Sequence, residues 1–285
     1  MFTDIVETIT NDGVTLAGAF FAPDHCDTVN STAILLVHGT YGNFYSPILL
    51  QHAKVFVDHG HAVASFNTRG HDGISVLKQQ PLLFGGTAFE NLADSISDLN
   101  ACIAWVQNRG FEKIAILGIS MGAVKVVYYQ AKIQNPAVSA VIAVSPVRLS
   151  KKYYLKTEAK DLYEYYNDTA HTFVNESLPD AVMNIRESIV PGTGFFGAQA
   201  YLDKYGGEDF DITHLGESIA CPILVMAGTE ETHPRLNDCA KDLATPIQHR
   251  NDVELIMVEK GTHGLRELGS ELPLTVMGWM ARNSG

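Results

Sequence analysis

The chain has 285 residues, which is enough for one large domain or two small ones, so length alone leaves the number of domains open. Its composition, 46% hydrophobic and 18% charged, excludes an intrinsically disordered chain and predicts a globular protein with an ample core. A formal net charge of −12 makes nucleic acids and anionic membrane surfaces poor partners, because both would repel the protein.

The first residues read MFTDIVE, with acidic side chains where a secretory signal needs a basic start followed by an apolar run. No stretch approaches the roughly 18 uninterrupted apolar residues that a transmembrane helix requires. We therefore expect a soluble, cytoplasmic protein without a membrane partner.

The first part of the chain is rich in predicted strands. Residues 2–10 and 14–22 flank an NDG turn, which predicts an antiparallel hairpin. Residues 33–37 (AILLV) are uniformly apolar, as expected for a central parallel strand that is buried on both faces. A helix over 46–59, a strand over 62–66 and a glycine-rich loop follow.

From residue 88 to 109 apolar side chains recur at spacings of three and four, which predicts a helix capped by Thr87 and ended by Gly110. The next elements are a strand over 113–117, a helix over 121–133 and a strand over 138–144. Such a β-α-β series forms a parallel sheet with right-handed crossovers.

An aromatic-rich stretch over residues 147–215 interrupts this alternation, and we expect it to be helical. The alternation then resumes with a strand over 222–227, a helix from near Pro234, a strand over 253–258 and a last helix from Leu265. The sequence therefore predicts an α/β fold with a mostly parallel central sheet, an N-terminal antiparallel hairpin and helices on both faces.

Residues 118–122 read GISMG, a G-x-S-x-G pattern that about one chain in ten of this length contains by chance. Its position is more specific, because a sharp turn between a strand and a helix exposes a serine hydroxyl at the carboxyl end of a sheet. Ser120 is therefore a candidate nucleophile, and the amide of Met121 is a candidate oxyanion donor. The alternative is a tight turn with a capping serine.

With this motif in place, the chain resembles the α/β-hydrolase family over nearly its whole length apart from residues 147–215. The LVHG sequence at 36–39 resembles the oxyanion loop of the family, which implies a second donor amide from Thr40 or, failing that, from Tyr41. The resemblance implies that the ring of His38 holds this loop. Contact of His38 and Tyr41 with substrate is the alternative.

Residues 67–73 (NTRGHDG) resemble the D-x-R-G-H-G segment of the family, with Asn67 in place of the usual aspartate. That segment is normally architectural. Its charged side chains could still contact substrate, and we treat Arg69 as a candidate substrate-binding residue beside His71 and Asp72.

The resemblance also implies a base and an acid. His263 lies in the loop between the last predicted strand and the last helix, and it completes the chain order Ser, acid, His. Glu231 stands at the acid position of the family, where aspartate is commoner, and a glutamate can still accept the imidazole N–H. Glu230 is the alternative acid, and a noncatalytic surface pair is a further interpretation.

These residues predict a serine hydrolase that cleaves a carboxylic ester, thioester or lactone through an acyl-enzyme on Ser120. We expect no cofactor, and no histidine and carboxylate spacing suggests a metal site. We expect a small-molecule substrate, and we consider a homodimer as the oligomeric state. The alternatives are carbon–carbon bond hydrolysis or acyl transfer by the same residues, and a noncatalytic ligand-binding protein on the same scaffold.

Residues 147–215 lie where the family inserts a lid, so the resemblance implies a helical cap on a core formed by 1–146 and 216–285. The PGTG sequence at 191–194 is a candidate hinge in this cap. Aromatic rings over the serine would favour an apolar or aromatic substrate, whereas simple packing of the cap on the core is the alternative for each ring. The rings are Tyr153, Tyr154, Tyr163, Tyr165, Tyr166, Phe173, Phe195, Phe196, Tyr201 and Tyr205.

Overall fold

The centre of the molecule is an eight-stranded sheet with the strand order β1-β2-β4-β3-β7-β8-β11-β12. The computed structural model describes residues 2–26, 28–29, 31–79, 81–186, 193–233, 235–236 and 238–283. The strands of this sheet are β1 (Phe2–Ile9), β2 (Thr15–Ala22), β3 (Thr32–Val37), β4 (Val63–Phe66), β7 (Lys113–Ile119), β8 (Val138–Val144), β11 (Ile223–Gly228) and β12 (Val253–Val258).

Most neighbouring strands in this sheet are parallel. Only the N-terminal hairpin departs from this pattern, since β1 runs antiparallel to β2 and β2 antiparallel to β4. The remaining pairs, from β4 through β3, β7, β8 and β11 to β12, are all parallel. The predicted mostly parallel sheet with an antiparallel N-terminal hairpin is therefore confirmed.

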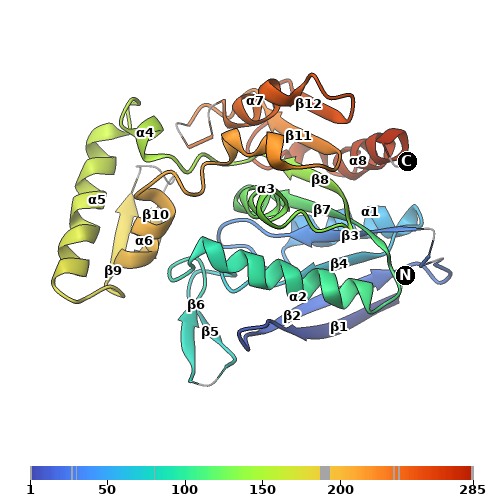
Figure 1. Cartoon of the computed structure of the whole chain (residues 1–285), viewed down its shortest axis with the longest axis horizontal. Coiled ribbons are helices and arrows are strands. Elements are labelled where there is room, and N and C mark those ends of the chain that lie inside the picture. Colours follow the sequence, from blue (N-terminus) through green and yellow to red (C-terminus); the bar gives the residue numbers. More distant parts are fainter. Residues whose placement is uncertain are drawn as a thin grey trace.

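Helices cover both faces of the sheet (Figure 1). On one face α1 (Pro47–Asp58) and α8 (Glu271–Asn283) pack together and bury their apolar residues in one core. On the other face α2 (Ser95–Gln107), α3 (Met121–Ile133) and α7 (Cys239–Ala244) contribute to a second core. The prediction of helices on both faces is confirmed.

The uniformly apolar strand β3 contributes side chains to both cores. Ala33, Leu35 and Val37 lie in the core beneath α2 and α3, whereas Ile34 and Leu36 lie in the core beneath α1 and α8. Successive side chains of a strand point to opposite faces, so a strand covered on both sides must be apolar at every position.

The helix predicted from residue 88 begins later than expected. A 3-10 turn, η1 (Leu92–Asp94), precedes α2, and the side chain of Asn91 caps it by accepting the N–H of Ala93. The predicted cap, Thr87, instead accepts the N–H of Tyr41 at 2.9 Å. The predicted start was wrong because a distant backbone amide competes for the threonine hydroxyl, which periodicity along the chain does not reveal.

Three further regions can be compared with the prediction. The glycine-rich loop contains a short hairpin of β5 (Ser75–Leu77) and β6 (Leu83–Gly85). The last helix begins at Glu271 rather than Leu265, because η5 (Arg266–Leu268) and Gly269, with a positive φ of 49°, intervene. Pro234, the predicted start of a helix, lies outside the described residues, and α7 begins at Cys239.

Residues 147–215, inserted between β8 and β11, are only partly helical and lie at the left of Figure 1, away from both termini. The segment also contains an antiparallel hairpin where a helical stretch was expected, and its two strands alternate buried and exposed side chains. Of the hinge expected at 191–194, positions 191 and 192 lie outside the described residues. The elements are α4 (Lys151–Tyr154), α5 (Lys160–Asn175), β9 (Val182–Arg186), β10 (Thr193–Gly197), α6 (Ala198–Tyr205), η2 (Ile212–His214) and η3 (Gly216–Ser218), the last just beyond the segment.

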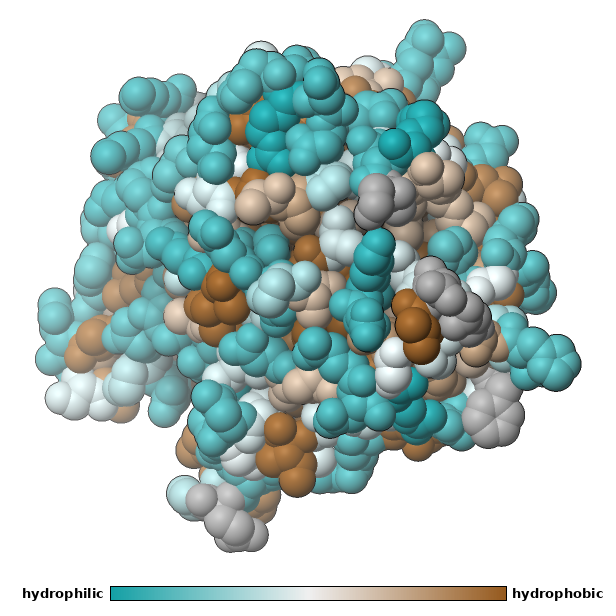
Figure 2. Space-filling view, turned by 45° about the vertical axis from the view of Figure 1, so that its right-hand side comes forward, coloured by the Kyte–Doolittle hydropathy of each residue, from teal (hydrophilic) through white to brown (hydrophobic). Residues whose placement is uncertain are grey.

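The surface shown in Figure 2 consists largely of hydrophilic residues, with hydrophobic ones in small groups. This distribution agrees with the excess of acidic over basic residues in the chain, which gives a formal net charge of −12. Within the described ranges no helix is both long enough and apolar enough to cross a membrane.

Two glycines allow β7, α3 and β3 to meet closely. A Cβ atom added to Gly118 would lie 2.1 Å from the carbonyl oxygen of Gly122, and one added to Gly122 would lie 2.2 Å from the carbonyl oxygen of Val37. Both distances are far below van der Waals contact, and both obstacles are backbone atoms that cannot rotate away. Glycine is therefore required on each side of Ser120.

We expect Gly122→Ala to lower the free energy of unfolding by about 1–3 kcal/mol or more, because α3 must move away from β3 to admit the methyl group. Urea denaturation of the two proteins measures the difference. The matched control is Gly278→Ala in α8, where the added Cβ would meet only Arg282 at 3.9 Å. That substitution should stabilise the protein by up to about 1 kcal/mol. Equal effects of the two substitutions would contradict the packing described.

Candidate active site

Ser120 occupies the sharp turn between β7 and α3 with an unusual backbone conformation. Its φ is 59° and its ψ is −120°, a region that residues with a side chain rarely adopt. The backbone is held there because the N–H of Ser120 donates to the carbonyl of Val144 at 2.9 Å. The turn places the serine side chain at the carboxyl end of the sheet, as the sequence motif predicts.

The structure brings Ser120, His263 and Glu231 together from loops that follow β7, β12 and β11. The Nε2 atom of His263 lies 2.9 Å from the Oγ of Ser120, and its Nδ1 atom lies 3.1 Å from the Oε2 of Glu231. The Glu231 side chain is only 3% exposed, whereas that of His263 is 38% exposed. The imidazole therefore stands between a buried carboxylate and an accessible hydroxyl.

Ser145 connects the acid to the loop that carries His263. Its hydroxyl donates to the Oε1 of Glu231 at 2.6 Å and accepts the N–H of Gly264 at 2.9 Å. Glu231 Oε1 also accepts the N–H of Gly228 at 3.0 Å, whereas the Glu230 side chain is exposed. Sequence reasoning missed Ser145, although its position directly after β8 places it at the same edge of the sheet as Ser120.

Backbone hydrogen bonds distinguish the two candidate amides of the oxyanion loop. The N–H of Tyr41 donates to the Oγ1 of Thr87, so it is already occupied. The N–H groups of Thr40 and Met121 donate to no acceptor in the part of the chain that the structure describes. Thr40 lines the same cleft as Ser120, and Met121 begins the helix that follows it. These two amides are therefore the available oxyanion donors.

The ring of His38 is tied to the loops on either side of it, although the residue also lines the cleft. Its ring is buried, its Nδ1 donates to the carbonyl of Gly39 at 2.9 Å and its Nε2 accepts the N–H of Thr68 at 3.0 Å. Burial, together with the nearby ammonium of Lys125, lowers the pKa of His38 to about 3 and keeps the ring neutral. Because both nitrogens are used, this geometry favours the role of holding the loop over the alternative of contact with substrate.

Tyr41 lies at the cleft and also contacts the inserted segment. Its φ of 59° is as unusual as that of Ser120, and its side chain is partly exposed. The Tyr41 hydroxyl accepts the N–H of Phe195, on β10, at 3.0 Å. Tyr41 therefore lines the cleft, as expected, and joins the oxyanion loop to residues 147–215.

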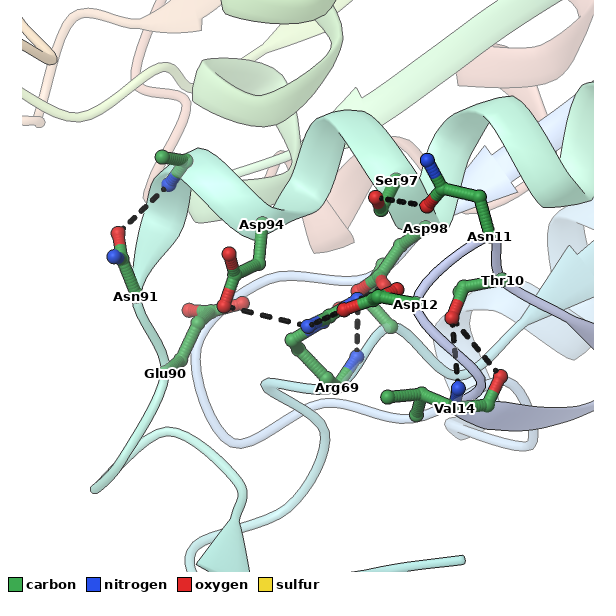
Figure 3. A network of polar contacts seen from close by, with 12 residues as sticks. Thr10, Asn11, Asp12, Val14, Arg69, Glu90, Asn91, Asp94, Ser97 and Asp98 are labelled. Carbon is green, nitrogen blue, oxygen red and sulfur yellow. Dashed lines mark hydrogen bonds and ion pairs between the residues drawn. The ribbon is translucent and has the colours of Figure 1, made fainter. Parts of the chain in front are cut away.

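Arg69 lies in an ion-pair network, shown in Figure 3, and not at the cleft. Its Nε is 2.9 Å from a carboxylate oxygen of Asp98, and its Nη1 is 2.8 Å from Asp12 and 3.3 Å from Asp94. Burial raises the pKa of Asp98 to about 6, against the attraction of the guanidinium. The expected contact of Arg69 with substrate was wrong, because its donors bind the turn of the N-terminal hairpin to α2.

The cleft beside Ser120 has a volume of about 560 Å³. Its apolar wall comes from the start of α1 and from Ile119, and Arg266 contributes a charged side chain to the lining. The lining residues are His38, Gly39, Thr40, Tyr41, Gly42, Ser46, Pro47, Ile48, Leu49, Gln51, Ile119, Ser120, His263, Gly264 and Arg266. A ligand in this cleft would meet an apolar wall opposite polar loops.

The aromatic residues of the inserted segment do not line this cleft, contrary to expectation. Phe196, Tyr201 and Tyr205 pack against one another with ring centroids 5.2–6.3 Å apart, and Tyr154 packs on Tyr163 at 5.4 Å. These rings are buried. Most of them stabilise the segment by packing on each other, which is the alternative that the sequence left open.

A buried cluster of charges joins α3, the helix that follows Ser120, to the inserted segment. The carboxylate of Glu90 lies 2.6 Å from the Nζ of Lys125, on α3, and 3.1 Å from the Nζ of Lys204, on α6. Burial alone would raise the pKa of Glu90, but the two ammonium groups hold it at about 2. The sequence signal for this cluster was Lys125 within the otherwise apolar run MGAVKVV at the start of α3.

The arrangement offers a hydroxyl, an imidazole within proton-transfer distance and two free amides at one edge of a sheet. These groups suit nucleophilic attack on a carbonyl followed by proton transfer. Among the residues with described positions, no group of three or more His, Cys, Asp or Glu side chains is placed to hold a metal ion.

A sequence model of the α/β-hydrolase fold family matches residues 32–189, which is more than half of the chain. The chain belongs to the α/β-hydrolase family. This membership makes it an enzyme of that family, as the sequence motifs predict. No curated protein has a sequence that matches this α/β-hydrolase significantly.

Solved structures that resemble this α/β-hydrolase cover nearly the whole chain. The α/β-hydrolase GrgF from Penicillium sp. sh18 is 16% identical with a TM-score of 0.74, and the match covers 99% of each chain. Est1E from Butyrivibrio proteoclasticus, solved with ferulic acid bound, is 14% identical with a TM-score of 0.68, covering 98% of this chain and 99% of that one. An esterase from Pyrococcus furiosus is 18% identical with a TM-score of 0.67, covering 100% and 92%. At these identities the likeness establishes the fold.

We expect Glu90→Gln to lower the free energy of unfolding by about 3 kcal/mol, because two buried ammonium groups would lose their carboxylate. Since the folded pKa of Glu90 is below its ordinary value of 4.5, its contribution is complete above pH 4.5 and lost as the pH falls towards 2. The stability difference between the two proteins should therefore shrink over that range. Denaturant titrations at several pH values measure it.

The matched control for this substitution is Glu254→Gln, which removes an exposed ion pair with Arg282. It should change stability by less than about 1 kcal/mol, because water screens that pair. A Glu90→Gln protein as stable as this control would contradict the role assigned to the buried cluster.

Proposed function

We propose that this enzyme is a serine hydrolase that cleaves a carboxylic ester, thioester or lactone through an acyl-enzyme on Ser120. The observation that carries the proposal is the continuous hydrogen-bonded arrangement of Ser120, His263 and Glu231, with distances of 2.9 and 3.1 Å. In this order a carboxylate orients the imidazole, and the imidazole can remove the proton of the serine hydroxyl.

In the first half of the reaction, the Oγ of Ser120 attacks the carbonyl carbon while the Nε2 of His263 takes the hydroxyl proton. The negative charge that develops on the carbonyl oxygen is stabilised by the N–H groups of Thr40 and Met121. Each such donor contributes about 3 kcal/mol to lowering the barrier. Glu231 accepts the Nδ1–H and stabilises the imidazolium ion.

To complete acylation, His263 gives this proton to the leaving oxygen or sulfur, and the bond between that atom and the acyl carbon breaks. A water molecule then attacks the acyl-enzyme while His263 again removes a proton, and Ser120 regains its hydroxyl as the acid is released. Atoms balance because one water supplies the hydroxyl of the acid and the hydrogen of the alcohol or thiol.

The substrate is a small or medium-sized molecule. The cleft of about 560 Å³ has room for a compact ester, and the apolar wall formed by Pro47, Ile48 and Leu49 favours an apolar portion. In this proposal residues 147–215 form a cap on a core of residues 1–146 and 216–285. The contacts of Tyr41 with Phe195 and of Lys204 with Glu90 support that division.

The names of two similar structures describe proteins related to ester chemistry. One of them is an esterase, and another was solved with ferulic acid, an aromatic carboxylic acid, bound to it. These names describe those proteins, and we extend them to this enzyme only as support for the choice of an ester as the first substrate to test.

We expect a fluorophosphonate to label the enzyme on Ser120, and p-nitrophenyl esters to be hydrolysed. Ser120→Ala should abolish labelling and lower kcat by on the order of 10⁶-fold, because the nucleophile is lost. Peptide mass spectrometry and the release of p-nitrophenol measure the two effects. Ser46→Ala, which changes another serine of the same cleft, is the control that should retain labelling.

Other outcomes of the same experiment select the competing functions. Labelling of Ser120 with only very slow ester hydrolysis would favour carbon–carbon cleavage or acyl transfer by the same residues. The absence of both labelling and turnover, with unchanged ligand binding in the Ser120→Ala protein, would favour a noncatalytic binding protein and reject the proposal.

We expect Glu231→Gln to lower kcat on the order of 10³-fold or more, because an amide neither fixes the same imidazole tautomer nor stabilises the imidazolium. Glu230→Gln, one residue earlier in the chain, is the matched control and should leave kcat within about twofold, since its side chain is exposed. Steady-state kinetics with one p-nitrophenyl ester compares them. A larger effect at position 230 would reject Glu231 as the acid.

A further inference from the structure

Arg235 is a buried arginine that has no carboxylate partner among the described residues. It is 4% exposed, yet no ion pair involves it. The other buried arginines are paired, since Arg69 binds Asp98 and Asp12, and Arg148 binds Asp242. A buried charge without a counter-ion is costly, so an unpaired guanidinium in the interior indicates a function that needs it.

The guanidinium of Arg235 lies beside the oxyanion loop. Its Nη2 donates to the hydroxyl of Thr40 at 3.3 Å, and its centre lies 5.8 Å from the ring centroid of Tyr205. Among the residues with described positions, the buried Nε–H of Arg235 finds no acceptor and the buried hydroxyl of Tyr205 finds no partner. Two unsatisfied donors therefore occur together next to the candidate oxyanion site, where an acceptor on a ligand could satisfy both.

Two lysines add to the positive charge around Arg235. Lys125 and Lys204 share the single carboxylate of Glu90 and lie with Thr40 and Tyr205 around one gap in the interior. Arg235 lies near enough to Lys204 for their charges to repel, so three cationic side chains gather near the buried carboxylate of Glu90. The protein as a whole has a net charge of −12, so this local excess of positive charge is opposite in sign to the rest of the molecule.

The position of His263 identifies which part of the substrate would approach Arg235. His263 lines the large cleft, and its imidazole must reach the leaving group to protonate it. A second gap meets the cleft at Gly39 and Thr40, which line both, and includes neither Ser120 nor His263. Arg235 adjoins this gap through its hydrogen bond to Thr40. The side of this gap therefore belongs to the acyl group in the proposed reaction.

We propose that Arg235 binds a carboxylate carried by the acyl group, so that the preferred substrates are half-esters or half-thioesters of short dicarboxylic acids. Two parallel N–H groups of a guanidinium match the two oxygens of a carboxylate, and the hydroxyl of Tyr205 can donate a further hydrogen bond. The proposal rests on the proposed function, because it assigns the acyl side of the same site.

The gap next to Thr40 is too narrow to hold a water molecule. An acyl group that enters it must displace a side chain, and Phe196 and Tyr205, on the inserted segment, form one wall. Side-chain rotations of this kind are common when ligands bind. Only a short acyl chain then places its carboxylate at Arg235 while its carbonyl remains at Ser120.

The test compares monoethyl glutarate with ethyl 5-methylhexanoate, in which an isopropyl group replaces the carboxylate with little change in shape. We expect kcat/KM to be at least about tenfold higher for the anionic ester, because hydrogen bonds to a charged group discriminate to that extent. Titration of the acid released, with and without enzyme, measures both reactions. Equal kcat/KM for the two esters would overturn the inference and leave the proposed function intact.

The variant Arg235→Met should lose the preference for the anionic ester while retaining hydrolysis of the neutral one, and Arg235→Lys should restore part of the preference. The ratio of kcat/KM values does not depend on the fraction of folded enzyme, and fluorophosphonate labelling of Ser120 checks the active sites present. Arg282→Gln is the matched control and should keep the preference, because that arginine is exposed at the end of α8 and lines neither cavity. An equal loss for both esters in Arg235→Met would show that Arg235 only positions Thr40 and would overturn the inference. Failure of every ester and of labelling would instead reject the proposed function.

Discussion

The hydrogen bond between His263 and Ser120 is the interaction on which the rest of the site depends. It joins residues 143 positions apart, one held by its backbone conformation and the other by side-chain hydrogen bonds. Ser120 keeps its positive φ because its N–H binds the end of β8 and because glycines on either side admit the close approach of α3 to β3. The imidazole is held by Glu231, whose other oxygen is bound by Ser145. Parallel strands ending at one edge of a sheet make this convergence possible.

Local patterns were sufficient to predict the elements that build this edge. The apolar run of β3 and the GISMG turn predict a buried central strand and an exposed serine, since both depend on side chains close in sequence. Thr87 and the hairpin of β9 and β10 were predicted incorrectly. Thr87 binds the amide of Tyr41, a partner far away in the sequence, and the hairpin lies in a segment whose aromatic content was taken as the stronger signal.

The partners of buried polar and charged side chains were the hardest to predict. Arg69 follows a family-like motif near the site, yet it binds Asp12 and Asp98, because a buried guanidinium requires carboxylates wherever the fold supplies them. Ser145 was overlooked because a serine after a strand has no distinctive spacing. The charge of Arg235 becomes informative only in the folded chain, where no carboxylate of the described residues pairs with it, so its meaning comes from the structure rather than from the sequence.

In the proposed mechanism, catalysis passes through a covalent acyl group on Ser120. The most direct measurement is mass spectrometry of enzyme quenched in acid during turnover of a slowly hydrolysed ester, followed by proteolysis. The account predicts a mass increase equal to that of the acyl group, confined to the peptide that contains Ser120 and absent after turnover ends. Continued turnover with the acyl group on another residue, or with no acylated peptide at all, would contradict it.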